Sequence, residues 1–249
     1  MNPLRIACWE PTELGTPILD AACSLYERTI DPDERIPWMW IERAVAERHL
    51  RRPSGWAKHL ILASTSSDVD DPNSLAGYAY GAFIPGFGGY LCYVGVAESA
   101  RRHGVGSRLF DSLTKTFAAD AALAGEPLPF VLWESYRPTA YDPESLHRLW
   151  AARTRTFERA GGLWVDGIEL ATPDYDDPDP IAEVPLQLFV KPVDEPVSRF
   201  TPDRLAGIAE QLLEKVYHEK SGDWFHDRTM QSVDEPRLRP ASQSVLVPA

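Results

Sequence analysis

Three arginines, a histidine and two glycines stand close together near the middle of the chain, in the segment Arg101-Arg102-His103-Gly104-Val105-Gly106-Ser107-Arg108. An apolar run precedes this segment and a helical pattern follows it, so the segment is expected to form the turn that opens a helix. The first amides of a helix lack intrahelical acceptors and carry partial positive charge, which favours an anion there. Glycines let the backbone approach that anion without an intervening side chain. The residue types and their spacing therefore predict a phosphate-binding turn.

Two other phosphate-binding patterns do not fit this segment. A P-loop needs Gly-Lys-Ser/Thr, whereas Ser107 and Arg108 follow Gly106. A dinucleotide fingerprint needs a third glycine at the position of Leu109 and an early βαβ unit, which the element pattern lacks. The predicted turn therefore belongs to neither class.

The segment instead resembles the acetyl-coenzyme A motif, Arg-x-x-Gly-x-Gly, of the GNAT N-acetyltransferase superfamily. The residues VGVAESARRHGVGSRLF (94–110) carry the resemblance, with Val96 five residues before Arg101, as is usual in that family. A second segment, TFERAGGLWVDG (156–167), is similar to the stretch that the family often writes as F-Y-x-x-x-G-F. The resemblance covers residues 4 to about 191.

The resemblance implies an α/β fold: a mixed, mostly antiparallel sheet with helices on both faces and a splayed central strand pair, followed by an extra C-terminal helix. It also implies a GNAT domain over residues 1–195, with a C-terminal helix and a flexible tail over 196–249.

The resemblance further implies which residues hold acetyl-coenzyme A. Backbone groups of the strand before the motif would pair with pantetheine, and the amides from Arg102 to Ser107 would hold the pyrophosphate. Arg101, Arg102 and Arg108 could add charge near the phosphates, or be solvated surface residues, and His103 could be an exposed loop histidine. The expected coenzyme-binding residues are Tyr93, Val94, Gly95, Val96, Arg101, Arg102, His103, Gly104, Val105, Gly106 and Ser107.

The chemistry implied is direct attack of a neutral amine on a thioester, which needs a base, an oxyanion contact and often an acid. The backbone amide near Val94 is expected to contact the oxyanion. Glu134, at the end of the apolar strand LPFVLWE, is the candidate base, because an apolar setting could raise the pKa of its carboxyl. The alternative is that Glu134 faces water or pairs with an arginine.

The position of the acid departs from the family pattern. Phe157 stands where the family frequently has Tyr, and Gly162 stands at the final Phe of the motif. Because phenylalanine cannot donate a proton, either Tyr136 or Tyr141 from the next loop supplies the hydroxyl, with Tyr141 our choice, or the thiolate leaves unaided. The departure also allows a protein that binds coenzyme A without catalysing transfer.

Two acidic loops bear on the acceptor. The loop DPDERIPWMW (31–40) joins the first two helices and in the family often covers the acceptor site; its acids could attract a cationic amine and its tryptophans could wall a pocket. The alternative is that the acids are solvated and the tryptophans anchor the helices. The segment PDYDDPDP (173–180) is similarly either a second acidic wall or a solvated connector. The first loop's candidate residues are Asp31, Asp33, Glu34, Trp38 and Trp40.

The composition limits the classes of partner that are expected. With 37 acidic against 25 basic residues, the net charge of −12 disfavours a nucleic-acid binder and favours a basic or neutral amine acceptor. No run is long enough to cross a bilayer, so no membrane partner is expected. Three widely spaced cysteines argue against a disulfide framework or a zinc site, so we expect no metal and a cytoplasmic location.

Periodicity predicts the elements that position these residues. The apolar residues Val105, Leu109, Leu113, Phe117 and Ala121 recur every fourth position and predict a helix from Gly104 to near Gly125. A last helix over 201–220 is expected to pack on the main domain or on a second subunit, and the tail from 236 is expected to be loosely held. The other expected strands cover 4–10, 58–65, 74–85, 86–98, 128–134, 163–170 and 184–191, and the other helices follow Thr16-Pro17, span 38–52 and follow Asp142-Pro143.

Three functions remain open on the sequence. The first is acetyl transfer from acetyl-coenzyme A to the primary amine of a small molecule. The second is transfer of a longer acyl group, and the third is a non-catalytic coenzyme A sensor or assembly partner.

Overall fold

The computed structural model describes residues 6–47, 55–66, 68, 71–173 and 182–240. Contacts divide the chain into two compact units, residues 1–128 and 129–249. The sequence predicts that the GNAT domain ends at residue 195, which lies inside the second compact unit. This domain boundary stays a prediction.

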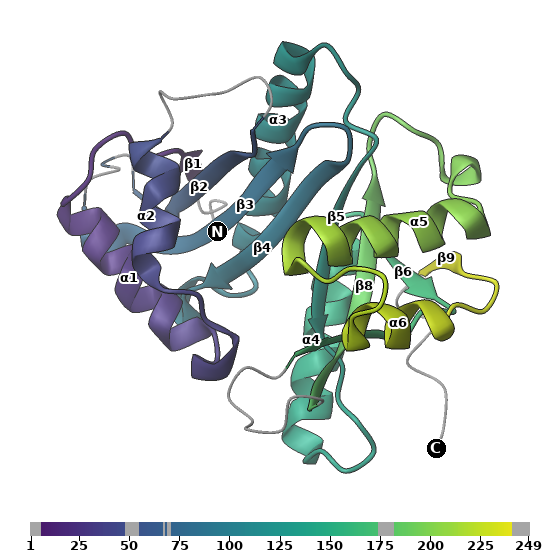
Figure 1. The fold of residues 1–249 in the computed structure, drawn as a ribbon. Coiled ribbons are helices and arrows are strands. Elements are labelled where there is room, and N and C mark those ends of the chain that lie inside the picture. The colour runs from purple at the N-terminus through teal and green to yellow at the C-terminus, as the bar shows by residue number, and fades with distance from the viewer. Residues whose placement is uncertain (1–5, 48–54, 67, 69–70, 174–181, 241–249) are drawn as a thin grey trace. The chain divides into compact units, whose positions relative to one another are not determined.

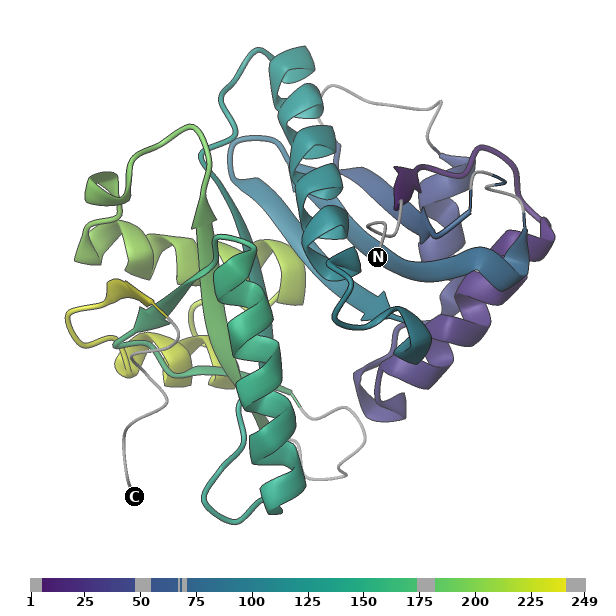
Figure 2. The same cartoon turned by 180° about the vertical axis from the view of Figure 1, so that it is seen from behind.

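The first unit has four antiparallel strands in the order β1-β2-β3-β4. Helices α1 and α2 cover one face of these strands and α3 covers the other, as the two opposite views show (Figures 1 and 2). The elements are β1 (Ala7–Trp9), α1 (Pro17–Thr29), α2 (Trp38–Ala46), β2 (Ala57–Ser64), β3 (Leu75–Ile84), β4 (Gly88–Val96) and α3 (Val105–Ala124).

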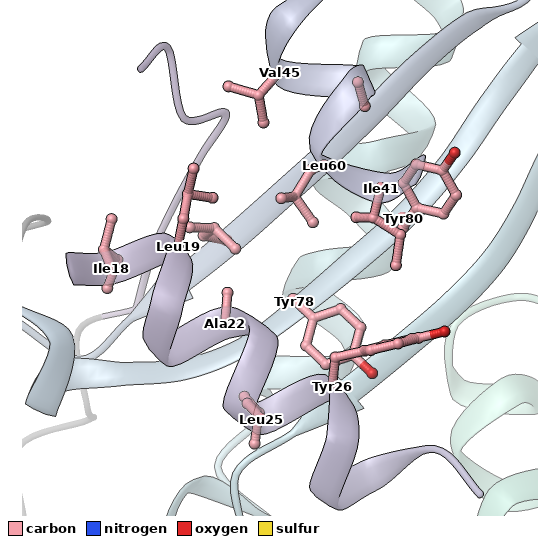
Figure 3. Packing of buried hydrophobic residues seen from close by; sticks show 12 residues of the cluster. Ile18, Leu19, Ala22, Leu25, Tyr26, Ile41, Val45, Leu60, Tyr78 and Tyr80 are labelled. Carbon is pink, nitrogen blue, oxygen red and sulfur yellow. The ribbon is translucent and has the colours of Figure 1, made fainter. Parts of the chain in front are cut away.

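Helix α1 begins where its sequence predicts. Pro17 takes the first helical position, where its missing N–H costs nothing. The predicted apolar stripe is buried against β2 and β3, and Tyr26 lies beside Tyr78 of β3 (Figure 3). The stripe is Ile18, Ala22, Leu25 and Tyr26.

Helix α3 lies between two glycines in the left-handed region, Gly104 (φ +81°) and Gly125 (φ +76°). All five residues of its predicted apolar face are buried. The helix packs on β2, β3 and β4 through this face. This packing fixes the position of its first turn relative to these strands.

The second unit is built around β8, which pairs with β5 along one edge and with β6 and β7 along the other, while β9 pairs with β6. Helix α4 covers one face and helices α5 and α6 cover the other (Figures 1 and 2). The elements are β5 (Phe130–Tyr136), α4 (Glu144–Arg159), β6 (Leu163–Asp166), β7 (Leu170–Pro173), β8 (Glu183–Pro192), α5 (Pro202–Leu212), a π-helical turn (Leu213–Tyr217), α6 (Trp224–Gln231) and β9 (Arg237–Pro240).

In the second unit, two predicted elements were wrong and one helix was missed. The single strand over 163–170 is two strands, because the chain turns at Gly167 (φ +82°). The helix predicted from Thr201 to about Lys220 is present and ends in the π-helical turn at Tyr217, but the sequence did not predict α6, which follows it. Residues 237–240 of the predicted loose tail are the strand β9, held by its ladder to β6 and by ion pairs of Arg237 and Arg239 with Asp166. Residues 241–249 lie outside the described part.

The predicted fold class is confirmed: the strand pairs described here are antiparallel, and helices cover both faces in each unit. The predicted splay between residues 88–96 and 130–136 stays a prediction. Among the described helices, none combines the length and the apolar character needed to cross a bilayer.

Candidate active site

The predicted phosphate turn connects β4 to α3. After Val96 the chain makes a 3-10 turn at Glu98–Ala100, followed by the exposed residues 101–104. Arg102 (φ +67°) and Gly104 (φ +81°) both adopt left-handed backbone, which a glycine does at no steric cost. These two residues turn the chain so that α3 begins at Val105.

The start of α3 has the character of an anion site. By helix geometry the amides of Val105, Gly106 and Ser107 have no intrahelical acceptor, and Gly104 has no side chain to cap them. A Cβ added at Gly104 would meet nothing within 4 Å, so the approach to these amides is open. The arrangement fits a phosphate group, which takes hydrogen bonds from the amides and is favoured by the helix dipole.

Positive charge gathers at the same place. Arg101, Arg102 and His103 are exposed, and their side chains make no hydrogen bond or ion pair with any residue that the structure describes. Arg108 is also exposed, one helical turn further on. On a chain of net charge −12, these groups form a local basic surface beside the free amides.

A cavity of about 230 Å³ adjoins this turn. Residues 73–76, before and at the start of β3, form one wall, and Ser99, Ala100 and His103 form another. Its lining contains hydroxyl and amide groups, which suits a polar part of a ligand held at the start of α3.

Strand β4 contains residues 93–96, whose backbone groups are predicted to pair with pantetheine. Its register against β3 shifts between Tyr80 and Gly81, so Cys92 has no partner residue and forms a bulge. After the bulge, Tyr93 and Gly95 lie on the face covered by α1, where the ring of Tyr78 and the hydroxyl of Thr29 leave no room for a Cβ at residue 95. The glycine therefore lets α1 pack closely on the strand.

Tyr93 connects this strand to the predicted acceptor loop. Its hydroxyl donates to the carbonyl of Glu34 at 2.8 Å, and its ring packs edge-on against Tyr26 at 5.2 Å. Burial raises the pKa of the Tyr93 phenol far above its usual range, so the hydroxyl stays a neutral donor. The side chain of Tyr93 thus serves to hold the loop, in addition to the role predicted for its backbone.

The predicted acceptor residues of the same loop differ in how exposed they are. Asp31 and Glu34 are exposed. Trp38 packs on Tyr26 and donates from Nε1 to Glu42, so it anchors α2, whereas Trp40 is 48% exposed. The side chain of Asp33 and residues 174–181 of the second acidic loop lie outside the described part.

Glu134, the predicted base, lies near the end of β5 and is half-buried. The hydroxyl of Tyr217 donates to Oε1 of this carboxylate at 2.7 Å. Sequence reasoning missed Tyr217, because the pairing joins β5 to a π-helical turn 83 residues later and no local spacing signals it. The hydrogen bond fixes the orientation of the carboxylate.

The predicted hydroxyl donors occupy the loop after β5. Tyr136 donates to Oδ2 of Asp142 at 2.8 Å, and the amide and hydroxyl of Thr139 bind the same carboxylate. These bonds lower the pKa of Asp142, with the Tyr136 phenol the largest cause. Tyr141, at the tip of the loop, is 99% exposed.

Phe157 and Gly162 depart from the family motif, and the side chain of Trp133 packs against both positions. Phe157 is buried on α4 against the rings of Trp133 and Phe189. The indole of Trp133 also occupies the space that a Cβ at Gly162 would need, at 2.4 Å. Trp133 therefore fills the volume next to both positions with an apolar ring.

Comparison with known families finds a match within the first unit. Residues 19–124 match the acetyltransferase (GNAT) family, a range that contains β4, the glycine turn and α3. The chain therefore contains a GNAT acetyltransferase domain, which supports an acetyl-coenzyme A-dependent acetyltransferase. The predicted resemblance is confirmed for this range, and the match does not extend to residues 156–167.

Solved structures of acetyltransferases are also similar to the chain. IAA acetyltransferase from Bacillus cereus is 11% identical, with 76% of this chain and 100% of that chain covered and a TM-score of 0.48. The ribosomal-protein-S18-alanine N-acetyltransferase from Escherichia coli is 14% identical, covering 77% and 96%, with a TM-score of 0.44. A Bacillus subtilis acetyltransferase in complex with CoA is 17% identical, covering 76% and 99%, with a TM-score of 0.42. No curated protein sequence matches the chain.

Proposed function

We propose that this protein transfers an acetyl group from acetyl-coenzyme A to the primary amine of a small molecule. The observation that carries the proposal is the start of α3, where three free amides and an open left-handed glycine lie within a GNAT acetyltransferase domain. Acetyl-coenzyme A is a substrate of this reaction, and its pyrophosphate is the anion for which the turn is suited.

The donor would be held by two segments of the first unit. Amides of residues 102–107 would bind the pyrophosphate, and Arg101, Arg102 and His103 would add positive charge beside it. Backbone groups of Tyr93, Val94, Gly95 and Val96 would pair with the pantetheine amides. The exposed basic side chains and the open approach to Gly104 support this assignment.

In the proposed reaction, the lone pair of a neutral amine attacks the thioester carbonyl carbon. The amide of Val94 would stabilise the oxyanion, and Glu134 would take the proton that the amine loses. The carbon–sulfur bond then breaks, the thiolate leaves with the electron pair, and Tyr141 would return a proton to sulfur. The hydrogen bond from Tyr217 supports the role of Glu134, because it holds the carboxylate in one orientation.

The acceptor is proposed to be a small basic amine. The exposed carboxylates of Asp31 and Glu34 support this class, since they lie in the loop that Tyr93 holds. A net charge of −12 favours the approach of a cation from solution. The three cysteines are free thiols, which supports a reducing compartment such as the cytoplasm.

Gly104→Val tests the donor site, with Gly125→Val as its matched control. Both glycines adopt the left-handed region at an end of α3 and both have open space at Cβ, so both substitutions strain the helix similarly. We expect Gly104→Val to abolish acetyl-coenzyme A binding in calorimetry, while Gly125→Val binds as the wild type does. Normal binding by a folded Gly104→Val protein would remove the proposed donor site.

A non-catalytic coenzyme A sensor is the second candidate. The burial of Phe157 among Trp133 and Phe189 favours it, because no hydroxyl is available at that position to protonate the thiolate. Release of free thiol from acetyl-coenzyme A in the presence of a panel of amines separates the two functions. Tight binding without thiol release for any amine would favour the sensor.

A further inference from the structure

Three potential metal ligands converge in the C-terminal part of the second unit. Glu210 comes from α5, Glu214 from the π-helical turn and His226 from α6. One ligand atom from each side chain lies within 4.8 Å of the other two. Glu210 and Glu214 are exposed and His226 is 4% exposed, so two exposed carboxylates lie near one buried imidazole.

The imidazole of His226 has a nitrogen without a hydrogen-bond partner. Its Nε2 is buried, and no described residue makes a hydrogen bond to it. The closest carboxylate oxygen, Oε1 of Glu210, is 3.8 Å away, which is too far for a hydrogen bond. Leaving a buried polar atom unsatisfied costs free energy, so this nitrogen is a candidate for binding a ligand.

The other ring nitrogen is already occupied. Oδ1 of Asp227 lies 3.0 Å from Nδ1 of His226 and also accepts from the backbone amide of Gly222 at 3.0 Å. With both contacts made by one oxygen, Asp227 can accept the Nδ1 proton of His226. That tautomer leaves a lone pair on Nε2, which lies within 4.8 Å of a carboxylate oxygen of Glu210 and of Glu214. A histidine held by a carboxylate at its other nitrogen is common at metal centres.

The surroundings of the cluster are acidic. Glu219 and Asp223 lie in the connection between the π-helical turn and α6, close enough for their charges to interact with each other, and that of Glu219 to interact with His226. Burial is the largest cause of the raised pKa of Glu219, and the charge of Asp223 adds to it. Negative charge near the cluster favours a cation there.

We propose that Glu210, Glu214 and His226 form a binding site for a divalent transition metal ion, with Zn²⁺ as the ion that the donor set favours. One imidazole nitrogen with two carboxylates suits Zn²⁺, whereas Mg²⁺ and Ca²⁺ prefer all-oxygen sites. The exposed glutamates can rotate to bring their oxygens to about 2 Å from the ion, and water completes the coordination.

The site would join three consecutive elements. Glu210 and Glu214 are one helical turn apart, across the change from α-helical to π-helical backbone, and π turns are frequent at functional positions. Tyr217, which holds Glu134, is in the same π-helical turn. A bound ion would therefore restrain the segment that positions the proposed base, although the metal site itself does not depend on the proposed reaction.

The test uses the full chain, stripped with a chelator and titrated with Zn²⁺ by calorimetry and thermal unfolding. We expect one equivalent to bind and to raise the melting temperature, because a ligand that binds only the folded state stabilises it. The double variant Glu210→Gln/Glu214→Gln keeps the size and exposure of both side chains and should lower the affinity at least about tenfold. Asp203→Asn, which removes a charge from the same helix, is the control and should bind as the wild type does.

Cobalt substitution identifies the ligands independently. Co²⁺ bound at this site should give visible d–d bands without the intense charge-transfer band of a thiolate, which a site at Cys8, Cys23 or Cys92 would show. A thiolate band, equal affinity in the double variant, or no Zn²⁺ binding to the wild type would each overturn the proposal. A loss of binding confined to the double variant would support it.

Discussion

Glu134 owes its orientation to Tyr217, a residue that no local pattern connects with it. A phenol 2.7 Å from a carboxylate oxygen makes a charge-assisted hydrogen bond, which is shorter and stronger than one between neutral groups. At the scale of single residues, the proposed catalytic carboxylate is therefore prepositioned by a side chain from another element.

Glu134→Gln should lower kcat by about a hundredfold or more, because an amide cannot accept the proton that a general base removes. The KM for acetyl-coenzyme A should stay unchanged, since the proposed donor site is on other elements. Steady-state thiol release measures both constants. Glu144→Gln on α4, which removes an exposed glutamate paired with Arg148 at the surface, is the control. An unchanged rate in Glu134→Gln would remove this residue from the mechanism.

Tyr217→Phe should lower kcat less than Glu134→Gln does and should move the acidic limb of the pH–rate profile to higher pH. The reason is that the ionised carboxylate loses a hydrogen bond that favours its charged form. A profile that keeps its position, with a rate equal to the wild type, would show that the hydroxyl of Tyr217 has no part in the reaction.

At the scale of elements, His59 joins β2 to α3 and to the segment after β1. Its Nε2 lies 2.5 Å from Oδ2 of Asp120 on α3, and its Nδ1 lies 2.6 Å from Oε1 of Glu10. Burial by itself lowers the pKa of His59, but the hydrogen bonds to Asp120 and Glu10 outweigh it, so the pKa is raised overall. The imidazolium is thus part of the core that holds α3 on the strands.

The raised pKa predicts how stability depends on pH. A histidine with a higher pKa in the folded state contributes fully below its unfolded value of about 6.5 and loses this contribution as pH rises through the folded value. The free energy of unfolding should therefore fall over that range in the wild type and fall less in His59→Gln. Urea unfolding across pH measures it, with the exposed His103→Gln as the control; a parallel fall in His59→Gln would contradict the prediction.

At the scale of the whole molecule, the chain after residue 195 is part of the second unit. Phe200 packs on Phe130, and the amide of Ala171 donates to the hydroxyl of Thr229 at 3.2 Å. Strand β9 extends the sheet at β6. The C-terminal helices also bury a set of apolar side chains, namely Leu205, Ile208, Leu212, Leu213 and Phe225.

Truncation after residue 195 should therefore abolish cooperative folding of the second unit, because it exposes the apolar surface that these helices cover. Circular dichroism and urea unfolding measure the loss. The full chain, measured under the same conditions, is the reference for the midpoint. A cooperative transition of unchanged midpoint in the shorter protein would make residues 1–195 an independent domain, as the sequence predicts.

Elements with a strong local signal could be predicted from the sequence. The four-residue apolar spacing and the flanking glycines predicted α3, and Thr16-Pro17 predicted the start of α1. The split at Gly167 and the strand β9 were missed, because a short strand at a sheet edge is stabilised by its partner more than by its own sequence.

The sequence by itself determined the helix start on which the proposed donor site rests: a basic, glycine-opened turn after a strand, whose spacing resembles a coenzyme A motif. Such a site consists of consecutive backbone amides, so its geometry follows from local residue types. Only the tertiary structure brought Tyr217 to Glu134, Glu10 and Asp120 to His59, and Glu210 and Glu214 to His226. Each of these groupings joins side chains from different elements, and their meeting depends on how strands and helices pack rather than on any spacing along the chain.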